Sequence, residues 1–279
     1  MNKLNLSIHK LLALAALLLS GLTAAAPPAP RIVSLNGTIS EIICELGRQG
    51  QLVGVDVTST YPAALDKLPK VGHTRNISAE GVLAQRPTLV VGTTESLKPE
   101  VAAQLKSAGV RVELFRQAYS VEGTKQLIKD VAAAFGASAE VPALLKKLDA
   151  QLTQVRKPAR APKVLFIYAR GTGTMMVAGQ GTQVEKIIQL AGGQNAATGF
   201  ADFKPLTPEA LVAANPDVLL LFDTGLSSLG GKAGLLQVPG IAQTSAGRTG
   251  RVVEMDGQLL TGFGPRLGLA ASELAKKIQ

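Results

Sequence analysis

The side chains of this sequence that could bind a metal ion or move a proton are few. It has two histidines, one cysteine, three tyrosines and no tryptophan. His9 lies in a segment that we expect to be removed on export, which leaves His73 as the only candidate for a histidine base. The sequence has neither a Gly-x-Ser-x-Gly elbow nor a glycine-rich nucleotide loop with its lysine. These absences indicate that the protein is not an enzyme.

Two glutamates, Glu80 and Glu209, occupy the same position in two versions of one motif. The stretches 78–91 and 207–220 align without a gap. In each stretch a hydroxyl residue can cap a helix, a proline ends that helix after two turns, and an apolar run suits a buried strand. Both carboxylates fall in the first helical turn, where they stabilise a helix by about 0.3–1 kcal/mol. The repeat predicts two similar α/β lobes with a cleft between them.

The N-terminal residues have the pattern of an export signal. Lys3 and Lys10 flank a positive start, 11–19 is an unbroken apolar run, and 23–25 are residues that suit a signal peptidase. We therefore expect residues 1–25 to be a cleaved signal peptide. The apolar run is shorter than the about 20 residues that span a membrane, and no cysteine follows it to carry a lipid anchor. We expect an exported protein without stable membrane insertion.

The composition indicates in which compartment the protein acts and which classes of partner it can bind. Cys44 is the only cysteine and cannot form an internal disulfide, and export without disulfides favours a bacterial periplasm. The formal charge of +9 falls to +7 when Lys3 and Lys10 are removed, which suits an anionic partner but also serves solubility. Without a run of five basic residues and with few aromatic residues, the sequence does not indicate nucleic-acid binding. We expect a monomer.

Apolar patterns divide the exported chain into two similar halves. Those of the first half predict strands at 32–35, 52–56, 89–92 and 110–115. Those of the second half predict strands at 163–169, 217–222 and 251–254, and a last helix at 264–278. Their alternation with helical patterns is typical of parallel sheets with crossover helices. Between the halves a helical pattern runs from Glu140 to about Arg156.

We therefore expect an N-terminal lobe at 26–138, a connecting helix at 139–160 and a C-terminal lobe at 161–279. A single packed helix between the lobes would allow them to tilt only slightly.

These elements and several short motifs resemble those of a known family, the helix-spined periplasmic binding proteins that feed ABC importers of cobalamin, siderophores and haem. Besides the two repeats, the motifs lie at 31–35, 40–47, 52–56, 61–62, 71–72, 190–193 and 264–266. The resemblance covers essentially the whole exported chain. The segment Asp56-Val-Thr-Ser-Thr-Tyr-Pro62 is most similar to the haem-delivery branch.

The resemblance implies an α/β fold of two similar lobes, with mainly parallel central sheets joined by one long backbone helix. It also implies a periplasmic solute-binding protein that captures haem b in the interlobe cleft and delivers it to the membrane subunits of an ABC importer. A ferric siderophore or a corrinoid is the alternative cargo. An exported interaction protein without cargo is a further alternative, which a closed groove between the lobes would favour.

The resemblance implies that Tyr61 is the haem-iron ligand. A phenolate is a hard anionic donor with precedent in haem proteins. Tyrosine ordinarily ionises near pH 10, so the metal and a nearby guanidinium must favour the anion, and we expect Arg75 to supply that guanidinium. His73 could touch the ligand or lie on a surface loop. The alternative for Tyr61 is a tyrosine that packs at a lobe surface.

The opposite wall of the cleft should come from the C-terminal lobe. Tyr168 is a second candidate for stacking on haem or ligating its iron, and a core role is an equal alternative. Arg170 could pair with a haem propionate. Other basic residues that could do so are Lys67, Lys70, Arg116 and Arg266. Because His73 is the only histidine of the exported chain, the zinc and manganese carriers of the wider superfamily, which need clusters of histidine and carboxylate ligands, do not fit.

The resemblance gives Glu80 and Glu209 a second role. Family members present one such glutamate on each lobe to arginines of the two membrane subunits of the transporter. Carboxylate–guanidinium pairs would fix the register of docking. Helix stabilisation and docking are compatible with each other.

Overall fold

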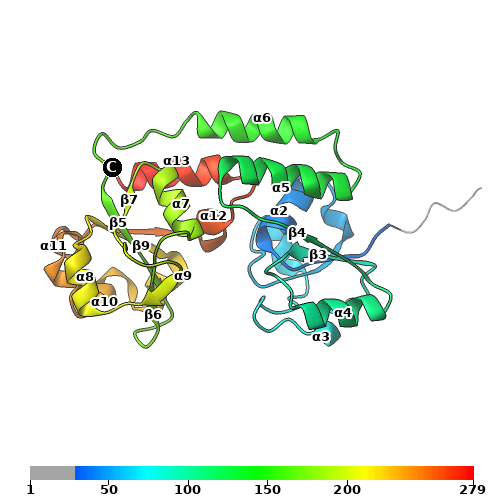
Figure 1. The fold of residues 1–279 in the computed structure, drawn as a ribbon, viewed down its shortest axis with the longest axis horizontal. Helices are drawn as coiled ribbons and strands as arrows, with labels where there is room; N and C mark the ends of the chain where they lie inside the picture. Colours follow the sequence, from blue (N-terminus) through cyan, green and yellow to red (C-terminus); the bar gives the residue numbers. More distant parts are fainter. Residues whose placement is uncertain (1–28) are drawn as a thin grey trace, which may run out of the picture. The chain divides into compact units, whose positions relative to one another are not determined.

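The computed structural model describes residues 29–279, and the predicted signal peptide lies outside the described residues. Residues 31–279 form one unit that contains two separate β-sheets and the helices that pack on them (Figure 1). We call the first sheet with its helices the N-terminal lobe and the second the C-terminal lobe. Among the described residues, no helix combines the length and the apolar composition needed to cross a membrane.

The N-terminal lobe is built on a parallel sheet in the order β2-β1-β3-β4. Its strands are β1 (Ile32–Ser34), β2 (Leu52–Val55), β3 (Leu89–Thr93) and β4 (Arg111–Phe115). Its helices are α2 (Gly37–Glu45), η1 (Gln49–Gln51), η2 (Ala63–Lys67), α3 (Ala79–Leu83), α4 (Pro99–Ser107) and α5 (Val121–Ala134). All four strands agree with the predicted ones to within one residue, because continuous apolar runs suit strands covered on both faces.

The C-terminal lobe has a mixed sheet in the order β10-β9-β5-β6-β8, with β7 paired to β5. Its strands are β5 (Lys163–Ala169), β6 (Met175–Ala178), β7 (Gln194–Asn195), β8 (Phe203–Pro205), β9 (Val218–Phe222) and β10 (Val252–Met255). Strands β5, β9 and β10 are parallel, as predicted. Strand β6 is antiparallel to both β5 and β8, and these two strands form an edge that the sequence did not predict in an otherwise parallel sheet.

The helices of the C-terminal lobe cover both faces of this sheet. They are α7 (Gln183–Leu190), α8 (Pro208–Ala214), α9 (Asp223–Ser228), α10 (Gly231–Leu236), η3 (Ile241–Gln243), α11 (Ser245–Thr249), α12 (Gly257–Thr261) and α13 (Leu267–Lys277). The repeated motif forms equivalent structures in the two lobes. Ser78 caps α3 before the buried strand β3, and Thr207 caps α8 before the buried strand β9.

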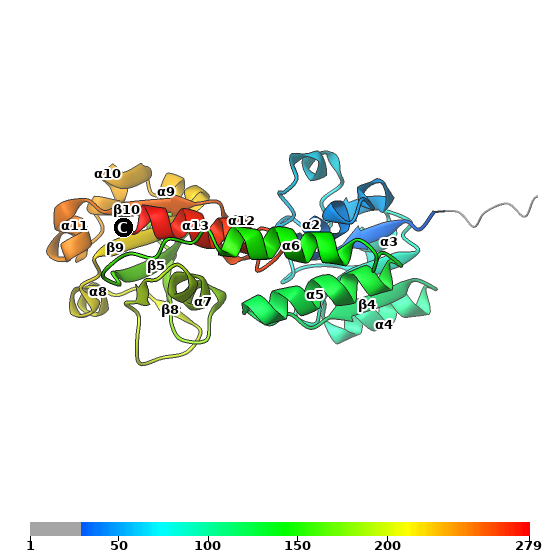
Figure 2. The same ribbon diagram turned by 90° about the horizontal axis from the view of Figure 1, so that it is seen from above.

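The connection between the lobes contains a shorter helix than we predicted. Helix α6 (Val141–Leu152) ends before the predicted limit near Arg156, and an irregular segment continues to β5. This helix lies against α5 and α13 (Figure 2). Gly268 allows the close approach of α13, because a Cβ atom there would lie 2.7 Å from the backbone nitrogen of Leu152. The link therefore contains a packed helix, as expected, but this helix is shorter than the predicted 139–160.

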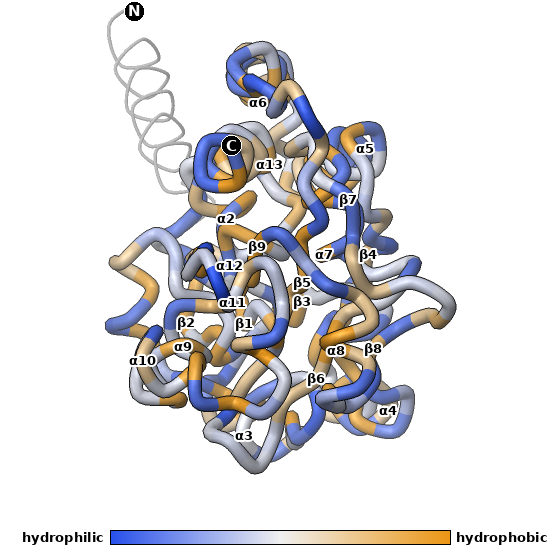
Figure 3. Tube along the Cα trace, turned by 90° about the vertical axis from the view of Figure 1, so that its left-hand side faces the viewer, coloured by the Kyte–Doolittle hydropathy of each residue, from blue (hydrophilic) through white to orange (hydrophobic). Residues whose placement is uncertain are grey.

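The two lobes share part of their hydrophobic core. Helices α6 and α13 carry both hydrophilic and hydrophobic residues (Figure 3), and Leu148 and Leu274 are fully buried between them and the lobes. The same buried cluster reaches Ile43 in the N-terminal lobe and Phe166 in the C-terminal lobe. Separating the lobes would expose this apolar surface to water, which is unfavourable. The shared core therefore opposes large movements of one lobe against the other.

Candidate functional site

A cleft of about 740 Å³ lies between the lobes, at the carboxyl ends of strands from both sheets. From the N-terminal lobe it is lined by Asn36, Gly37, Thr38, Val57, Thr58, Thr60, His73, Gln117 and Tyr119. From the C-terminal lobe it is lined by Tyr168, Ala169, Arg170, Gln183, Phe222, Asp223, Thr224, Ser228, Asp256, Gly257, Gln258, Thr261 and Gly262. Parallel α/β sheets bind ligands at these strand ends, and the volume falls in the range of about 300–1,000 Å³ that is common for small-molecule sites.

A buried carboxylate fixes the loop that follows β2. Asp56 is fully buried and accepts hydrogen bonds from the backbone N–H of Thr58 at 3.0 Å and the hydroxyl of Ser59 at 2.6 Å. The ammonium group of Lys70 donates to the carbonyl of Ser59 at 2.9 Å. Because these bonds fix the start of the loop, they also restrict the residues that follow it, including Tyr61.

Tyr61 is not among the residues that line the cleft, although it follows the lining residue Thr60, and it remains partly accessible to solvent. Its side chain is 39% exposed, and the neighbouring Thr60 lines the cleft. The guanidinium carbon of Arg266 lies 3.6 Å from the centroid of the Tyr61 ring. This distance is typical of a cation–π contact. The backbone N–H of Tyr61 donates to Oε1 of Gln258 at 2.9 Å. A ring face and a backbone donor of Tyr61 are thus both held by residues of the C-terminal lobe.

We expected Arg75 to supply the guanidinium beside Tyr61, and the guanidinium that lies against the Tyr61 ring is that of Arg266. Arg75 lies in an exposed turn, where its backbone N–H donates to Nδ1 of His73 at 3.3 Å. Arg266, which we considered as a propionate partner, precedes α13 and reaches Tyr61 from the other lobe.

Arg266 is itself anchored by a buried carboxylate. Its Nη2 atom lies 2.9 Å from Oε2 of Glu41, a residue of α2 that is 3% exposed. Burial raises the pKa of Glu41 above its ordinary value, although the hydrogen bond and the charge of Arg266 act in the opposite direction. Neither Glu41 nor Gln258 was a candidate from the sequence. Nothing in the sequence of α2, where Glu41 lies among isoleucines, indicates a partner 225 residues away.

The opposite wall carries the residues that the sequence placed there. Tyr168 and Arg170 both line the cleft, and the guanidinium carbon of Arg170 lies 5.8 Å from the Tyr168 ring centroid. The Tyr168 ring packs edge-on against Phe222, with the centroids 6.2 Å apart. Tyr119 also lines the cleft, and burial followed by the charge of Glu95 raises its pKa. The structure thus brings Tyr168, Arg170 and His73 to one cleft.

Glu80 and Glu209 lie away from the residues that line the cleft. Each is exposed in the first turn of its helix, α3 or α8. A carboxylate there faces the positive end of the helix dipole. Both side chains are accessible to a partner protein.

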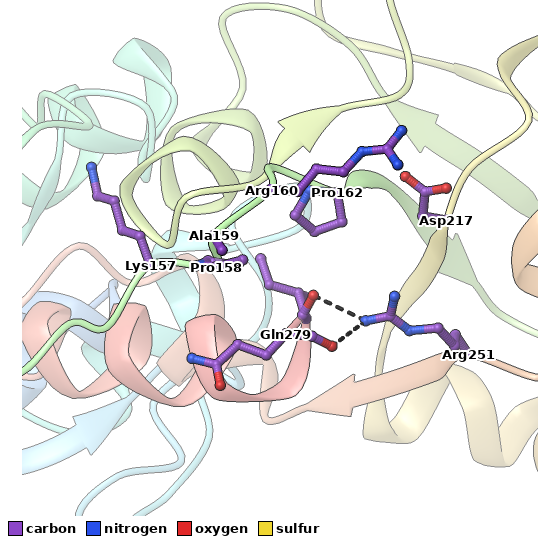
Figure 4. A pocket seen from close by; sticks show the side chains of 9 residues that line it. Lys157, Pro158, Ala159, Arg160, Pro162, Asp217, Arg251 and Gln279 are labelled. Atoms are coloured by element: carbon purple, nitrogen blue, oxygen red, sulfur yellow. Dashed lines mark hydrogen bonds between the residues drawn. The ribbon is translucent and has the colours of Figure 1, made fainter.

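A second pocket lies at the other end of the C-terminal sheet (Figure 4). It is lined by Lys157, Arg160, Asp217, Arg251 and neighbouring residues near the beginnings of β5, β9 and β10. The guanidinium of Arg251 donates to the main-chain oxygens of Ile278, at 3.0 Å, and Gln279, at 2.6 Å. Because Arg251 already holds the last turn of the chain, this pocket has a structural explanation.

The raised pKa of Glu41 predicts a particular dependence of stability on pH. The folded protein keeps a proton on Glu41 that the unfolded chain releases above its ordinary pKa of 4.5. The stabilisation linked to this proton is fully present below that value and is lost as the pH rises through the raised pKa. Relative to Glu41→Gln, which cannot titrate, the wild-type free energy of unfolding should fall as the pH rises above 4.5 and should level off above the raised pKa.

Urea unfolding of both proteins across this range measures the difference. A difference that instead grows in favour of the wild type with rising pH would mean that the charge of Arg266 outweighs the burial of Glu41.

Comparisons with known proteins agree with this geometry. Residues 32–259 match the family described as periplasmic binding protein. Among solved structures, the chain is similar to the periplasmic heme-binding protein RhuT from Roseiflexus sp. RS-1 in its apo form, with 43% identity, a TM-score of 0.86, and coverage of 90% of this chain and 98% of RhuT. It is also similar to the periplasmic heme-binding protein BhuT in complex with two hemes, with 41% identity, a TM-score of 0.83, and coverage of 89% and 97%.

Two curated relatives have other descriptions. The chain is 30% identical to the uncharacterized ABC transporter substrate-binding lipoprotein YvrC of Bacillus subtilis (strain 168), over 89% of this chain and 79% of YvrC. It is 27% identical to a cobalamin-binding protein of Halobacterium salinarum, over 85% of this chain and 66% of that protein.

Proposed function

The chain belongs to the periplasmic binding protein family, and we propose that it captures haem in its interlobe cleft through Tyr61 and delivers it to the membrane subunits of an ABC importer. The observation that carries this proposal is the setting of Tyr61. Tyr61 follows the lining residue Thr60, is partly exposed, and carries the Arg266 guanidinium on one face of its ring. A fixed positive charge over the ring favours the phenolate form, and a phenolate is a suitable anionic oxygen ligand for ferric iron.

The remaining lining of the cleft can serve the rest of the haem molecule. The ring edge and face of Tyr168, with Phe222, offer apolar surface for a porphyrin. Arg170 is exposed at the same wall and can pair with a propionate, and His73, which lines the cleft from the other lobe, can contact the ligand there. An arginine binds a carboxylate through two parallel hydrogen bonds, which would orient the porphyrin as well as hold it.

A corrinoid is the second candidate cargo, because several curated relatives are described as cobalamin-binding or vitamin B12-binding proteins. The solved structures described as heme-binding proteins are more similar, at 32–43% identity against 27% or less. A ferric siderophore is less consistent with the composition, because aromatic walls usually hold such ligands and this chain has no tryptophan. Haem therefore best explains the partly exposed Tyr61 and its contact with Arg266.

Separate titrations of the purified apoprotein identify the cargo. We expect haemin to bind to saturation and to give a high-spin ferric spectrum with charge-transfer bands toward the red. Cyanocobalamin and a ferric hydroxamate siderophore, followed by calorimetry under the same conditions, should show no saturable binding. Tight binding of cyanocobalamin with only weak, non-saturable haemin binding would overturn the proposal in favour of a corrinoid carrier.

A further inference from the structure

Three side chains connect Tyr61 to the lobe on the other side of the cleft. Gln258 and Arg266 come from the C-terminal lobe, and Glu41 is the N-terminal residue that anchors Arg266. We call these three residues the interlobe seam. Oε1 of Gln258 accepts hydrogen bonds from the backbone N–H groups of Thr60, at 2.8 Å, and Tyr61, at 2.9 Å. The seam therefore touches the backbone as well as the ring of Tyr61.

The orientation of the Gln258 amide is determined by partners at both of its ends. Its Nε2 donates to the carbonyl of Gly37 at 2.9 Å, and to Oε2 of Glu41 at 3.4 Å. Turning the amide around would place its N–H groups against the N–H groups of Thr60 and Tyr61. Gly37 permits this arrangement, because a Cβ atom there would lie 2.7 Å from the carbonyl oxygen of Thr58. Gln258 thus holds the Tyr61 loop in one position.

The ion pair of the seam is not arranged for the greatest stability. Oε1 of Glu41 and Nε of Arg266 are two of the three buried side-chain polar atoms without a hydrogen-bond partner in the described part of the chain. A buried ion pair with unmet hydrogen bonds often contributes less to stability than apolar residues of the same volume. Its effect here is positional. It holds the guanidinium of Arg266, whose side chain is 13% exposed, against the Tyr61 ring.

We propose that Glu41 and Gln258 are positioning residues for Tyr61, so that the lobe opposite the tyrosine sets the place of the iron ligand. This inference rests on the proposed function for the identity of the ligand. Its consequence concerns release of the cargo. Because Gln258 and Arg266 belong to the C-terminal lobe, even a slight tilt between the lobes would move both relative to Tyr61. Such a tilt on the transporter would then weaken the iron–tyrosine bond without any change in Tyr61 itself.

The test compares two seam variants with a control. Gln258→Leu removes the contacts to the backbone of Thr60 and Tyr61, and Glu41→Gln removes the charge that anchors Arg266. Thr124→Val is the control, because the Thr124 hydroxyl donates to the carbonyl of Phe263 at 3.0 Å, which is also a contact between the lobes but does not touch Tyr61. Thermal unfolding of each apoprotein shows that it is folded.

Two readouts follow the position of Tyr61. In the apoprotein, hydrogen exchange of the Tyr61 amide should become about tenfold faster in Gln258→Leu, because its acceptor is lost. In the haemin complex, both seam variants should release haemin to apomyoglobin about 10–100-fold faster than wild type, which is the usual effect of losing a group that supports a metal ligand. Their charge-transfer bands should shift. Thr124→Val should release haemin at the wild-type rate.

The outcomes separate this inference from the proposed function. If Tyr61→Phe loses the charge-transfer bands while both seam variants keep wild-type bands, release rates and amide exchange, the positioning role is overturned and the function stands. If Tyr61→Phe keeps the bands, Tyr61 is not the iron ligand, and both the ligand assignment and the inference built on it are overturned. If Thr124→Val releases haemin as fast as the seam variants, general loosening of the lobes explains the effect and the inference is overturned.

Discussion

Replacing Tyr61 with phenylalanine should weaken haemin binding by about a hundredfold or more and abolish the charge-transfer bands. Residues that only support a metal ligand typically contribute about 10–100-fold in affinity. Removing the ligand itself should therefore weaken the affinity for haemin by at least about a hundredfold. A hundredfold corresponds to about 2.7 kcal/mol of binding free energy. The ring and its contact with Arg266 remain in Tyr61→Phe, so the change is confined to the oxygen. Soret titration and visible spectra of the two proteins measure it.

Two other tyrosines of the cleft provide matched controls. Tyr119 and Tyr168 both line the cleft, and each packs edge-on against a phenylalanine. Tyr119→Phe and Tyr168→Phe remove the same atom from the same cleft. If Tyr168→Phe rather than Tyr61→Phe removes the bands, the iron ligand comes from the C-terminal lobe, and the assignment of Tyr61 is wrong.

Replacing Glu80 and Glu209 together with alanine should abolish haem uptake by cells while haemin binding to the purified protein is unchanged. Neither residue lines the cleft, and both are exposed. If each carboxylate pairs with a buried arginine of a membrane subunit, each loss costs about 2–5 kcal/mol of docking free energy. Even the lower value for both pairs weakens docking about a thousandfold. Growth on haemin as the only iron source and haemin titration measure the two effects.

The chain offers a control with the same local chemistry. Glu100 and Glu122 are also exposed in the first turns of helices, α4 and α5, but lie outside the repeated motif. Replacing this pair with alanine removes the same charge and the same interaction with a helix dipole. If Glu100→Ala with Glu122→Ala impairs uptake as strongly as the repeated pair does, loss of negative charge explains the effect, and docking through Glu80 and Glu209 is contradicted.

The fold could be predicted where the sequence has long apolar runs. Strands β3 and β9 follow helix caps and prolines in both copies of the repeat, so each could be located from local pattern alone. Strands β6 and β8 could not, because they are short, partly exposed and follow glycine-rich or polar segments. Helix α6 ends at Leu152 although its apolar spacing continues to Val155. Periodicity therefore does not locate the end of a helix.

The functional site, like the fold, could be predicted only in part. A tyrosine before a proline, in a segment that resembles one known branch of a family, was enough to select Tyr61. The residues that contact Tyr61 could not be predicted from a local pattern, because Gln258 and Arg266 are about 200 residues away along the chain. Contacts between lobes depend on how two separately folded sheets pack, and a local pattern does not encode that packing. Nearness in sequence therefore favoured Arg75, whereas the fold places Arg266 against the Tyr61 ring.

A crystal structure of the protein with haemin tests the central claim most directly. The account predicts a porphyrin in the interlobe cleft, the Tyr61 oxygen bonded to the iron, and the Arg266 guanidinium still against the Tyr61 ring. Iron bound to a different side chain, with the Tyr61 oxygen directed into solvent or into the protein, would contradict it.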